Sequence, residues 1–307
     1  MQRKLAQTFS GHKSQVVKLA FLPSGDILAS VSADGTLNLW NLKTGKLVKK
    51  LSDPKDSFGA FALSDDGTML AKSGPGNSVR LYDLVNNKAL LTLKGHREFI
   101  NQMVFSPDGK YLATVSDDRT LVLWDVSTGK IAGKIDGFKD SVLTADFSPG
   151  GGILVTGDAS GVVNHWNVPA LKQLANIQAN KLNEEINSVS FSPNSKWIAT
   201  SGSAGFLKIW NTDLSDSDKD LESRLKTVYA TVFSPDSRWL LAAGSGNKVE
   251  IYDVGSGQLE GELVTNEPSI YTIAISSDGK SLAVSGSDKK VELWQPGKQG
   301  VSVAKTP

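Results

Sequence analysis

The sequence predicts an all-β protein built from seven copies of one four-stranded unit. An aromatic residue closes a short predicted strand seven times, at Trp40, Tyr82, Trp124, Trp166, Trp210, Tyr252 and Trp294. Subtraction of these positions gives intervals of 42, 42, 42, 44, 42 and 42 residues. A fixed period of this size indicates copies of one supersecondary unit, either stacked or arranged around a ring. No stretch of the chain shows the apolar periodicity of a helix.

The third copy shows the predicted elements most clearly. A Phe-Ser-Pro-Asp-Gly turn at 105–109 precedes an apolar strand at 111–114, and a second turn at 116–119 precedes the strand at 121–125. The turn at 127–130 then leads into a further strand at 131–135. Pro and Gly at these points set turn geometry, while β-branched and aromatic runs suit half-buried strands. Each period therefore holds four strands joined by hairpins.

The repeated motifs resemble those of the WD-repeat β-propeller family over nearly the whole chain. Gly11-His12 is matched with Trp40-Asn41, Gly95-His96 is matched with Trp124-Asp125, and the Phe-Ser-Pro turn recurs at Phe105, Phe147, Phe191 and Phe233. The resemblance implies one closed ring of seven blades, at about 40 to 45 residues per blade. We expect residues 1–294 to form this propeller and residues 295–307 to be a tail or an extra edge strand.

The chain also indicates how the ring closes. Residues 4–12 match the outer-strand segment 88–96 position for position, so the N-terminal strand is expected to complete the last blade. Such a latch removes the open edges of a broken ring. Val301-Ser302-Val303 also falls where the last outer strand would be counted from Trp294, but the N-terminal match is longer and is preferred.

Composition excludes several classes of function. Lys and Arg total 33 against 32 Asp and Glu, so no overall field attracts nucleic acid or an anionic membrane. The absence of cysteine excludes disulfides and thiolate sites, and the three histidines are not expected to converge, so neither metal nor cofactor is predicted. No apolar run is long enough to span a membrane. We expect a cytoplasmic monomer; because the first strand begins almost at Met1, a removed leader stays open as an alternative.

The resemblance implies a buried hydrogen-bonded chain in two blades. It would join His12, Ser30, Asp34 and Trp40 in the first blade, and His96, Thr114, Asp118 and Trp124 in the third. A buried indole N–H and imidazole need acceptors, and a satisfied network stiffens a blade. A catalytic role would require an open pocket, whereas this spacing buries the residues against a Trp. We therefore interpret both sets as structural.

The other blades depart from this pattern and are expected to rely on apolar packing. Blade two is the least regular, because Lys72 occupies the position of the strand hydroxyl. Its amine is predicted either to pair with Asp53 or Asp56 or to reach solvent. In blade five, segment 212–223 is rich in acids but lacks the Gly and Glu of a calcium loop. A frayed, solvated edge is the preferred interpretation of that segment.

Function is expected on the loops that enter the innermost strands, since this face commonly captures peptides or partner domains in the resembled family. Four successive blades place a basic residue at one loop position, namely Lys13, Lys55, Arg97 and Lys139, with Phe99 as an aromatic anchor. Glu184, Glu185 and Glu267 are expected to add acid across the ring. The sequence thus predicts a non-enzymatic scaffold that binds a protein partner through an acidic or phosphorylated segment. The alternative is a propeller enzyme acting at the central channel, for which the sequence offers no convergent set of titratable residues.

Overall fold

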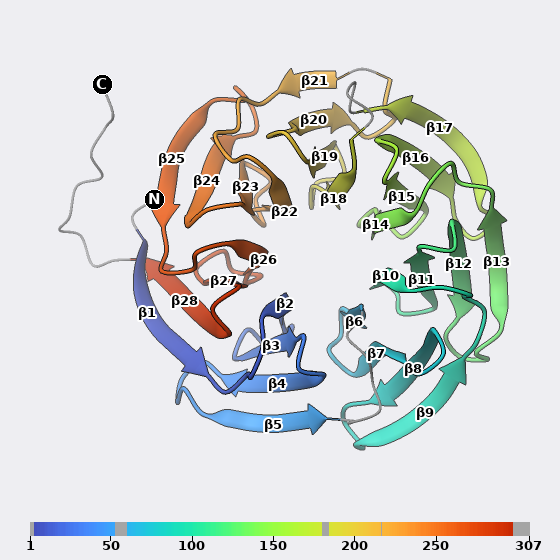
Figure 1. The fold of residues 1–307 in the computed structure, drawn as a ribbon, viewed down its shortest axis with the longest axis horizontal. Helices are drawn as coiled ribbons and strands as arrows, with labels where there is room; N and C mark the ends of the chain where they lie inside the picture. Colours follow the sequence, from blue (N-terminus) through green and yellow to red (C-terminus); the bar gives the residue numbers. More distant parts are fainter. Residues whose placement is uncertain (1–2, 53–59, 180–183, 216, 297–307) are drawn as a thin grey trace.

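A computed structural model of the chain shows a ring of seven four-stranded antiparallel sheets (Figure 1). It describes residues 3–52, 60–179, 184–215 and 217–296. The sheets are arranged as blades around a central opening, with the first strand of each blade innermost. The predicted seven-bladed all-β architecture is confirmed.

The four strands of each blade run in order from the innermost to the outermost position. Blade 1 holds β2 (Val16–Phe21), β3 (Ile27–Ser32), β4 (Thr36–Asn41) and β5 (Leu47–Ser52); blade 2 holds β6 (Phe61–Leu63), β7 (Met69–Gly74), β8 (Ser78–Asp83) and β9 (Lys88–Leu93); blade 3 holds β10 (Ile100–Phe105), β11 (Tyr111–Ser116), β12 (Thr120–Asp125) and β13 (Ile131–Asp136); blade 4 holds β14 (Val142–Phe147), β15 (Ile153–Asp158), β16 (Val162–Asn167) and β17 (Lys172–Gln178). Blade 5 holds β18 (Ile186–Phe191), β19 (Trp197–Gly202), β20 (Leu207–Asn211) and β21 (Ser217–Asp220); blade 6 holds β22 (Val228–Phe233), β23 (Trp239–Gly244), β24 (Lys248–Asp253) and β25 (Leu259–Val264); blade 7 holds β26 (Ile270–Ile275), β27 (Leu282–Gly286), β28 (Lys290–Pro296) and β1 (Arg3–Ser10).

The Ser-Pro-Asp-Gly turn of blade 3 shows why the hairpins form where they do. The Ser106 hydroxyl donates to the Asp108 carboxylate at 2.7 Å and accepts the Tyr111 backbone N–H at 2.9 Å. Gly109 has a φ of 69°, which favours glycine because it has no Cβ. The side chains of the turn therefore satisfy the backbone groups that the reversal leaves unpaired.

The ring is closed by its first strand. β1 pairs antiparallel with β28, from Arg3 opposite Pro296 to Ser10 opposite Lys290. Phe9 is buried, and its ring centroid lies 5.3 Å from that of Trp40 in blade 1. Closure by the N-terminal strand is therefore confirmed. β28 extends through Gln295 and Pro296, while residues 297–307 lie outside the described part of the chain.

Neighbouring blades are joined by apolar cores and by a set of hydrogen bonds near the ring centre. In the seam between blades 2 and 3, Leu81 packs in one cluster with Ile100, Met103 and Leu112. Closer to the axis, side chains on the innermost strands accept backbone N–H groups of the following blade. These pairs are Gln102 with Ala145 at 3.1 Å, Thr144 with Val189 at 3.2 Å, and Thr272 with Leu19 at 3.1 Å. The blades thus form one continuous unit.

The acidic segment of blade 5 is paired instead of frayed. β21 forms an antiparallel ladder with β20, with Asp220 opposite Lys208 and Lys219 opposite Ile209. The Lys208 ammonium lies 2.6 Å from the Asp220 carboxylate. The interpretation of this segment as a frayed edge is therefore wrong for β21, because cross-strand charge pairing compensates for the missing apolar alternation.

Helices do not occur in the described ranges, so none of those residues forms a helix that could cross a membrane.

Candidate functional site

Blade 1 contains a hydrogen-bonded chain that runs from a surface loop to its core aromatic residue. His12 Nε2 lies 2.7 Å from the Ser30 hydroxyl, which also accepts the Trp40 indole N–H at 2.8 Å. On the other side of the ring, Nδ1 lies 2.9 Å from the Thr36 hydroxyl, which donates to Asp34 at 2.5 Å. His12 itself is 3.8 Å from Asp34. The four predicted residues are brought together, with Thr36 as an intermediate that sequence reasoning missed.

Blade 3 contains a more direct version of the same chain. His96 Nδ1 lies 3.0 Å from Asp118, and Nε2 lies 2.7 Å from the Thr114 hydroxyl, which accepts the Trp124 indole N–H at 2.9 Å. Burial lowers the pKa of His96, and Asp118 opposes this shift. Burial would raise the pKa of Asp118, but hydrogen bonds from the Thr120 hydroxyl, the Arg97 backbone N–H and His96 keep it below its usual value.

Both carboxylates also fix the loop that follows the histidine. A second oxygen of Asp34 accepts the Lys13 backbone N–H at 2.6 Å, and Asp118 accepts the Arg97 backbone N–H at 2.8 Å. The side chains of Lys13 and Arg97 are exposed. The buried chains therefore hold the backbone of two residues whose cationic groups face solvent, which connects the core of each blade to its loop face.

Lys139 is exposed at the equivalent loop position of blade 4, and Phe99 is 44% exposed two residues beyond Arg97. The fourth member of the predicted basic set, Lys55, lies outside the described residues. The loops that enter the innermost strands share one rim, because each four-stranded meander returns to the same side of the ring before the next blade begins. The structure thus places Lys13, Arg97, Phe99 and Lys139 along the part of that rim formed by blades 1, 3 and 4.

The predicted acidic side of this rim is smaller than expected. Glu267 is 1% exposed, and its carboxylate accepts the Asp288 backbone N–H at 3.1 Å. Burial raises its pKa to about 7. The expectation that Glu267 adds surface acid is therefore wrong, because this carboxyl group is an internal acceptor in blade 7. Glu185 is exposed and accepts the Ser203 hydroxyl at 3.1 Å.

Comparison with family models decides the classification of the chain. The model described as WD domain, G-beta repeat (WD40) matches six segments, at residues 3–41, 87–125, 129–167, 171–211, 220–253 and 257–295. These segments cover well over half of the sequence. The chain belongs to the WD40 repeat family. Proteins with WD40 propellers typically act as interaction scaffolds, and here the repeats form the seven-bladed ring described above.

Two curated proteins share shorter stretches with this WD40 chain. The p21-activated protein kinase-interacting protein 1-like of Xenopus laevis is 50% identical over 40 residues, which are 13% of this chain and 11% of the relative. Eukaryotic translation initiation factor 3 subunit I of Neurospora crassa is 43% identical over 47 residues, which are 15% of this chain and 14% of the relative. Each match has the length of about one WD40 repeat.

The six matched WD40 segments leave out residues 42–86, which hold most of blade 2. In that blade, Lys72 stands where blades 1 and 3 have the hydroxyl, and its amine lies 5.6 Å from the centroid of the Tyr82 ring. An ammonium group over an aromatic face is stabilised by the ring quadrupole. The predicted partners Asp53 and Asp56 lie outside the described residues.

The expectation that the remaining WD40 blades rely on apolar packing alone is wrong. In blades 4 and 5 a strand threonine still accepts the indole N–H, from Trp166 to Thr156 at 3.0 Å and from Trp210 to Thr200 at 2.7 Å. Phe138 occupies the histidine position of blade 4, and its ring centroid lies 5.6 Å from that of Trp166. An aromatic contact thus replaces the imidazole there.

Blades 6 and 7 use a glutamate on the third strand, two residues before the aromatic. The buried Glu250 accepts the Tyr252 hydroxyl at 2.7 Å and the Arg224 backbone N–H at 2.9 Å. Glu292 accepts the Trp294 indole N–H at 3.0 Å. A carboxylate on the third strand thus takes the acceptor role that the second-strand hydroxyl of Ser30 or Thr114 has in blades 1 and 3. An acidic residue inside an apolar strand pattern was the available sequence signal.

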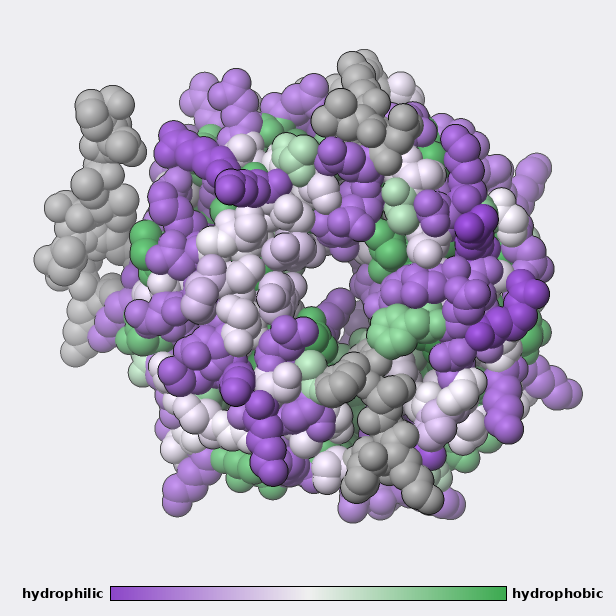
Figure 2. All heavy atoms as spheres, viewed as in Figure 1, coloured by the Kyte–Doolittle hydropathy of each residue, from purple (hydrophilic) through white to green (hydrophobic). Residues whose placement is uncertain are grey.

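Sequence reasoning also missed a pair of charged residues at the centre of the ring. Lys18 on β2 and Asp146 on β14 belong to innermost strands of blades 1 and 4, and they interact electrostatically. Figure 2 shows the opening that these strands surround. Desolvation raises the pKa of Asp146 to about 7, although the Phe191 backbone N–H donates to its carboxylate at 2.7 Å and Lys18 also opposes the shift. Within the described ranges, no cluster of three or more His, Asp or Glu side chains could hold a metal ion.

Proposed function

We propose that this WD40 protein is a non-enzymatic scaffold that binds an acidic or phosphorylated segment of a partner protein. The binding surface is the loop rim that carries Lys13, Arg97, Phe99 and Lys139, called the basic rim below. The observation that carries the proposal is the anchoring of two basic residues by largely buried carboxylates, since Asp34 and Asp118 accept the backbone N–H groups of Lys13 and Arg97.

This anchoring favours binding because it orders the loop backbone before the partner arrives. A flexible loop would lose conformational freedom on binding, whereas a fixed loop has already lost it in folding. The cationic side chains stay exposed and can attract carboxylates or phosphates over several ångströms. Arginine adds a planar donor group that suits two oxygens of a phosphate or carboxylate.

Phe99 supplies a contact of a different kind at the same rim. Its side chain is 44% exposed although phenylalanine gains free energy on burial. Aromatic side chains placed among cationic ones act mainly after encounter, by filling a pocket or covering apolar surface of the partner. The proposed segment therefore combines acidic or phosphorylated residues with at least one apolar side chain.

The test compares two triple variants in binding to partners captured from native lysate and then purified. The variant Lys13→Glu, Arg97→Glu, Lys139→Glu reverses the basic rim. A matched control, Lys46→Glu, Lys130→Glu, Lys172→Glu, reverses three exposed lysines at equivalent turns of the same blades on the opposite rim. We expect the first variant to slow association and to weaken its dependence on salt, while the control binds like the parent.

Phe99→Ala is expected to speed dissociation with little effect on association, because the ring contributes after encounter. Surface plasmon resonance at two salt concentrations measures both rates. Equal loss in the two triple variants would mean that charge alone, without a defined surface, drives association. Unchanged binding by the reversed basic rim would refute the proposed site.

A further inference from the structure

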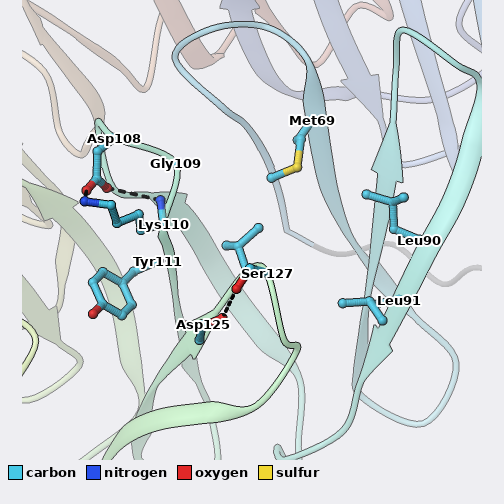
Figure 3. Close-up of a pocket in the computed structure, with 10 residues that line it drawn as sticks. Met69, Leu90, Leu91, Asp108, Gly109, Lys110, Tyr111, Asp125 and Ser127 are labelled. Carbon is cyan, nitrogen blue, oxygen red and sulfur yellow. Dashed lines mark hydrogen bonds and ion pairs between the residues drawn. The ribbon is translucent and has the colours of Figure 1, made fainter.

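A groove on the outer surface lies between blades 2 and 3, on the rim opposite the basic rim. It has a volume of about 760 Å³. Its apolar wall is formed by Met69 together with Leu90 and Leu91 on β9, and these leucines are 42% and 37% exposed. Figure 3 shows these side chains facing the turns of blade 3 that contain Asp108 and Asp125. We call this site the β9 groove.

Two other seams of the same ring show how a lysine of the outer strand can cover this position. In the seam between blades 1 and 2, the Lys49 ammonium donates to the Leu84 carbonyl at 3.4 Å. In the seam between blades 5 and 6, the Lys219 ammonium donates to the Val254 carbonyl at 2.8 Å. Both lysines lie on the outer strand, and both carbonyls belong to the residue two positions after the aromatic of the next blade. In these two seams the carbonyl thus receives a lysine side chain, whereas the position of the lysine is held by Gln7, Gly133, Ala175 and Gly261 in four other seams.

The β9 groove keeps this carbonyl but lacks the lysine. Leu91 lies opposite Leu81, as Lys49 lies opposite Leu39 in blade 1. Val126 follows Trp124 by two residues, which makes its carbonyl the equivalent of the Leu84 and Val254 carbonyls. Among the residues that the structure describes, no donor to the Val126 carbonyl is found, although the Val126 N–H donates to the Lys110 backbone carbonyl at 2.9 Å. In this seam a large apolar side chain occupies the position of the lysine, and the acceptor is open.

The charges around the groove also favour a cation. Asp108 is paired with Lys110 at 3.0 Å, so these two charges offset each other. Asp125 uses one carboxylate oxygen to accept the hydroxyl groups of Ser127 and Thr128, at 2.7 Å and 2.8 Å. Figure 3 shows Asp125 and Ser127 at the edge of the groove. In blade 2, the equivalent Asp83 is one of the carboxylates that interacts electrostatically with Lys49.

We propose that the β9 groove binds a partner segment in which a lysine is flanked by large apolar residues. The lysine ammonium would donate to the Val126 carbonyl beside Asp125, and its methylene groups would lie along Leu91. The flanking apolar residues would cover Met69 and Leu90. This site is separate from the basic rim and selects a positively charged segment. One ring could therefore hold an acidic segment on one rim and a basic segment on the other.

The probe is a nine-residue synthetic peptide, Gly-Ser-Leu-Leu-Lys-Leu-Leu-Ser-Gly, compared with the same peptide carrying norleucine in place of lysine. Norleucine keeps the apolar chain and removes the ammonium group. We expect the lysine peptide to bind more tightly by about tenfold or more, the usual effect of one charge-assisted hydrogen bond. Methyl NMR is expected to show shifts at Met69, Leu91 and Val126 with the lysine peptide.

The decisive variant is Leu91→Lys, which places a lysine where blades 1 and 5 already carry one. The new lysine is expected to donate to the Val126 carbonyl in place of the peptide. The variant should therefore melt at or above the temperature of the parent and bind the peptide about tenfold or more weakly. Val48→Lys is the matched control, because it adds a lysine to the exposed outer strand of blade 1. That control should bind the peptide like the parent.

Three results would overturn the proposal. Equal affinity for the lysine and norleucine peptides would show only a nonspecific apolar surface. Undiminished binding by a folded Leu91→Lys protein would place the peptide elsewhere. Dimerisation of the parent in sedimentation experiments, abolished by Leu91→Lys, would assign the groove to a second copy of this chain.

Discussion

His96 Nδ1 lies 3.0 Å from the Asp118 carboxylate, and both side chains are almost completely buried. The same carboxylate accepts the Arg97 backbone N–H, so one acidic group links the core of blade 3 to its loop. In blade 1 the corresponding His12 and Asp34 are 3.8 Å apart and communicate through Thr36. The two blades therefore share a motif but differ in how the carboxylate contacts the histidine, directly in blade 3 and through a threonine hydroxyl in blade 1.

Asp118→Asn is expected to destabilise the protein by about 1 to 3 kcal/mol. The amide keeps one acceptor oxygen, whereas the carboxylate serves Thr120 with one oxygen and both His96 and the Arg97 N–H with the other. Asp34→Asn is the comparison and should cost less, since His12 does not contact Asp34 closely. Urea unfolding of both variants measures the difference. Equal costs would show that the direct contact is unimportant.

Deletion of residues 1–10 is expected to lower the melting temperature by many degrees and to promote aggregation. The deletion removes β1, exposes the edge of β28 and exposes the part of the Trp40 ring that Phe9 covers. Phe9→Ala, which leaves the strand in place, should cost about 3 to 5 kcal/mol. Removal of residues 300–307 serves as the control in the same calorimetric scan. A larger effect from that C-terminal deletion would assign the latch to the other end of the chain.

Glu250→Leu is expected to be more damaging than Tyr252→Phe. Loss of the carboxylate leaves the Ser223 hydroxyl and the Arg224 N–H without this acceptor, and it leaves the Tyr252 hydroxyl only the Glu222 carbonyl at 3.3 Å. Each unsatisfied buried group costs about 1 to 3 kcal/mol. Tyr252→Phe removes one donor and leaves Glu250 with two others, so about 1 kcal/mol is expected. Guanidinium titrations of both variants would contradict this account if the order were reversed.

His165→Leu is expected to make the protein less sensitive to acid. His165 is 4% exposed, its Nε2 has no partner within the described residues, and burial lowers its pKa while Asp213 opposes the shift. The unfolded chain takes up this proton near the ordinary pKa of about 6.5, before the folded protein does. Stability contributed by neutral His165 is therefore complete above about pH 6.5 and falls as the pH decreases below it.

The leucine variant should accordingly lose less stability than the parent between about pH 6.5 and pH 5. Leucine suits the position, because the equivalent residues in blades 1 and 3 are the buried Leu39 and Leu123. Thermal melts across this range measure the difference between the two proteins. Parallel curves would mean that His165 does not titrate differently in the folded state.

The regular part of the fold could be predicted from the sequence because it repeats. The aromatic residues at intervals of 42 or 44 residues, the recurrent Phe-Ser-Pro turns and the match between residues 4–12 and 88–96 all indicate the same strand positions. Agreement among independent local signals is the condition under which a sequence specifies its fold. The His12 and His96 chains were predicted for the same reason, as complete copies of a known pattern.

Features that occur once or connect distant blades could not be predicted in this way. Lys18 and Asp146 are separated by more than a hundred residues in the sequence, and their electrostatic interaction requires blades 1 and 4 to share one ring. Glu250 and Glu292 supply from the third strand the acceptor that a second-strand hydroxyl supplies in blades 1 and 3, so a position-by-position comparison found no counterpart. Glu267 occupies a loop position in the alignment of the repeats, yet backbone geometry turns it inward to Asp288.

The pairing of β1 with β28 also sets a delay during synthesis, because the first strand must wait for a partner that is made last. These strands are separated by about 280 residues, and synthesis at about 5 to 20 residues per second places roughly 15 to 60 s between them. During that interval β1 lacks its partner strand, and Phe9 has only the blade 1 part of its apolar cluster. The nascent chain thus carries an unpaired strand edge until β28 is made, and exposed edges of this kind are what chaperones protect during synthesis.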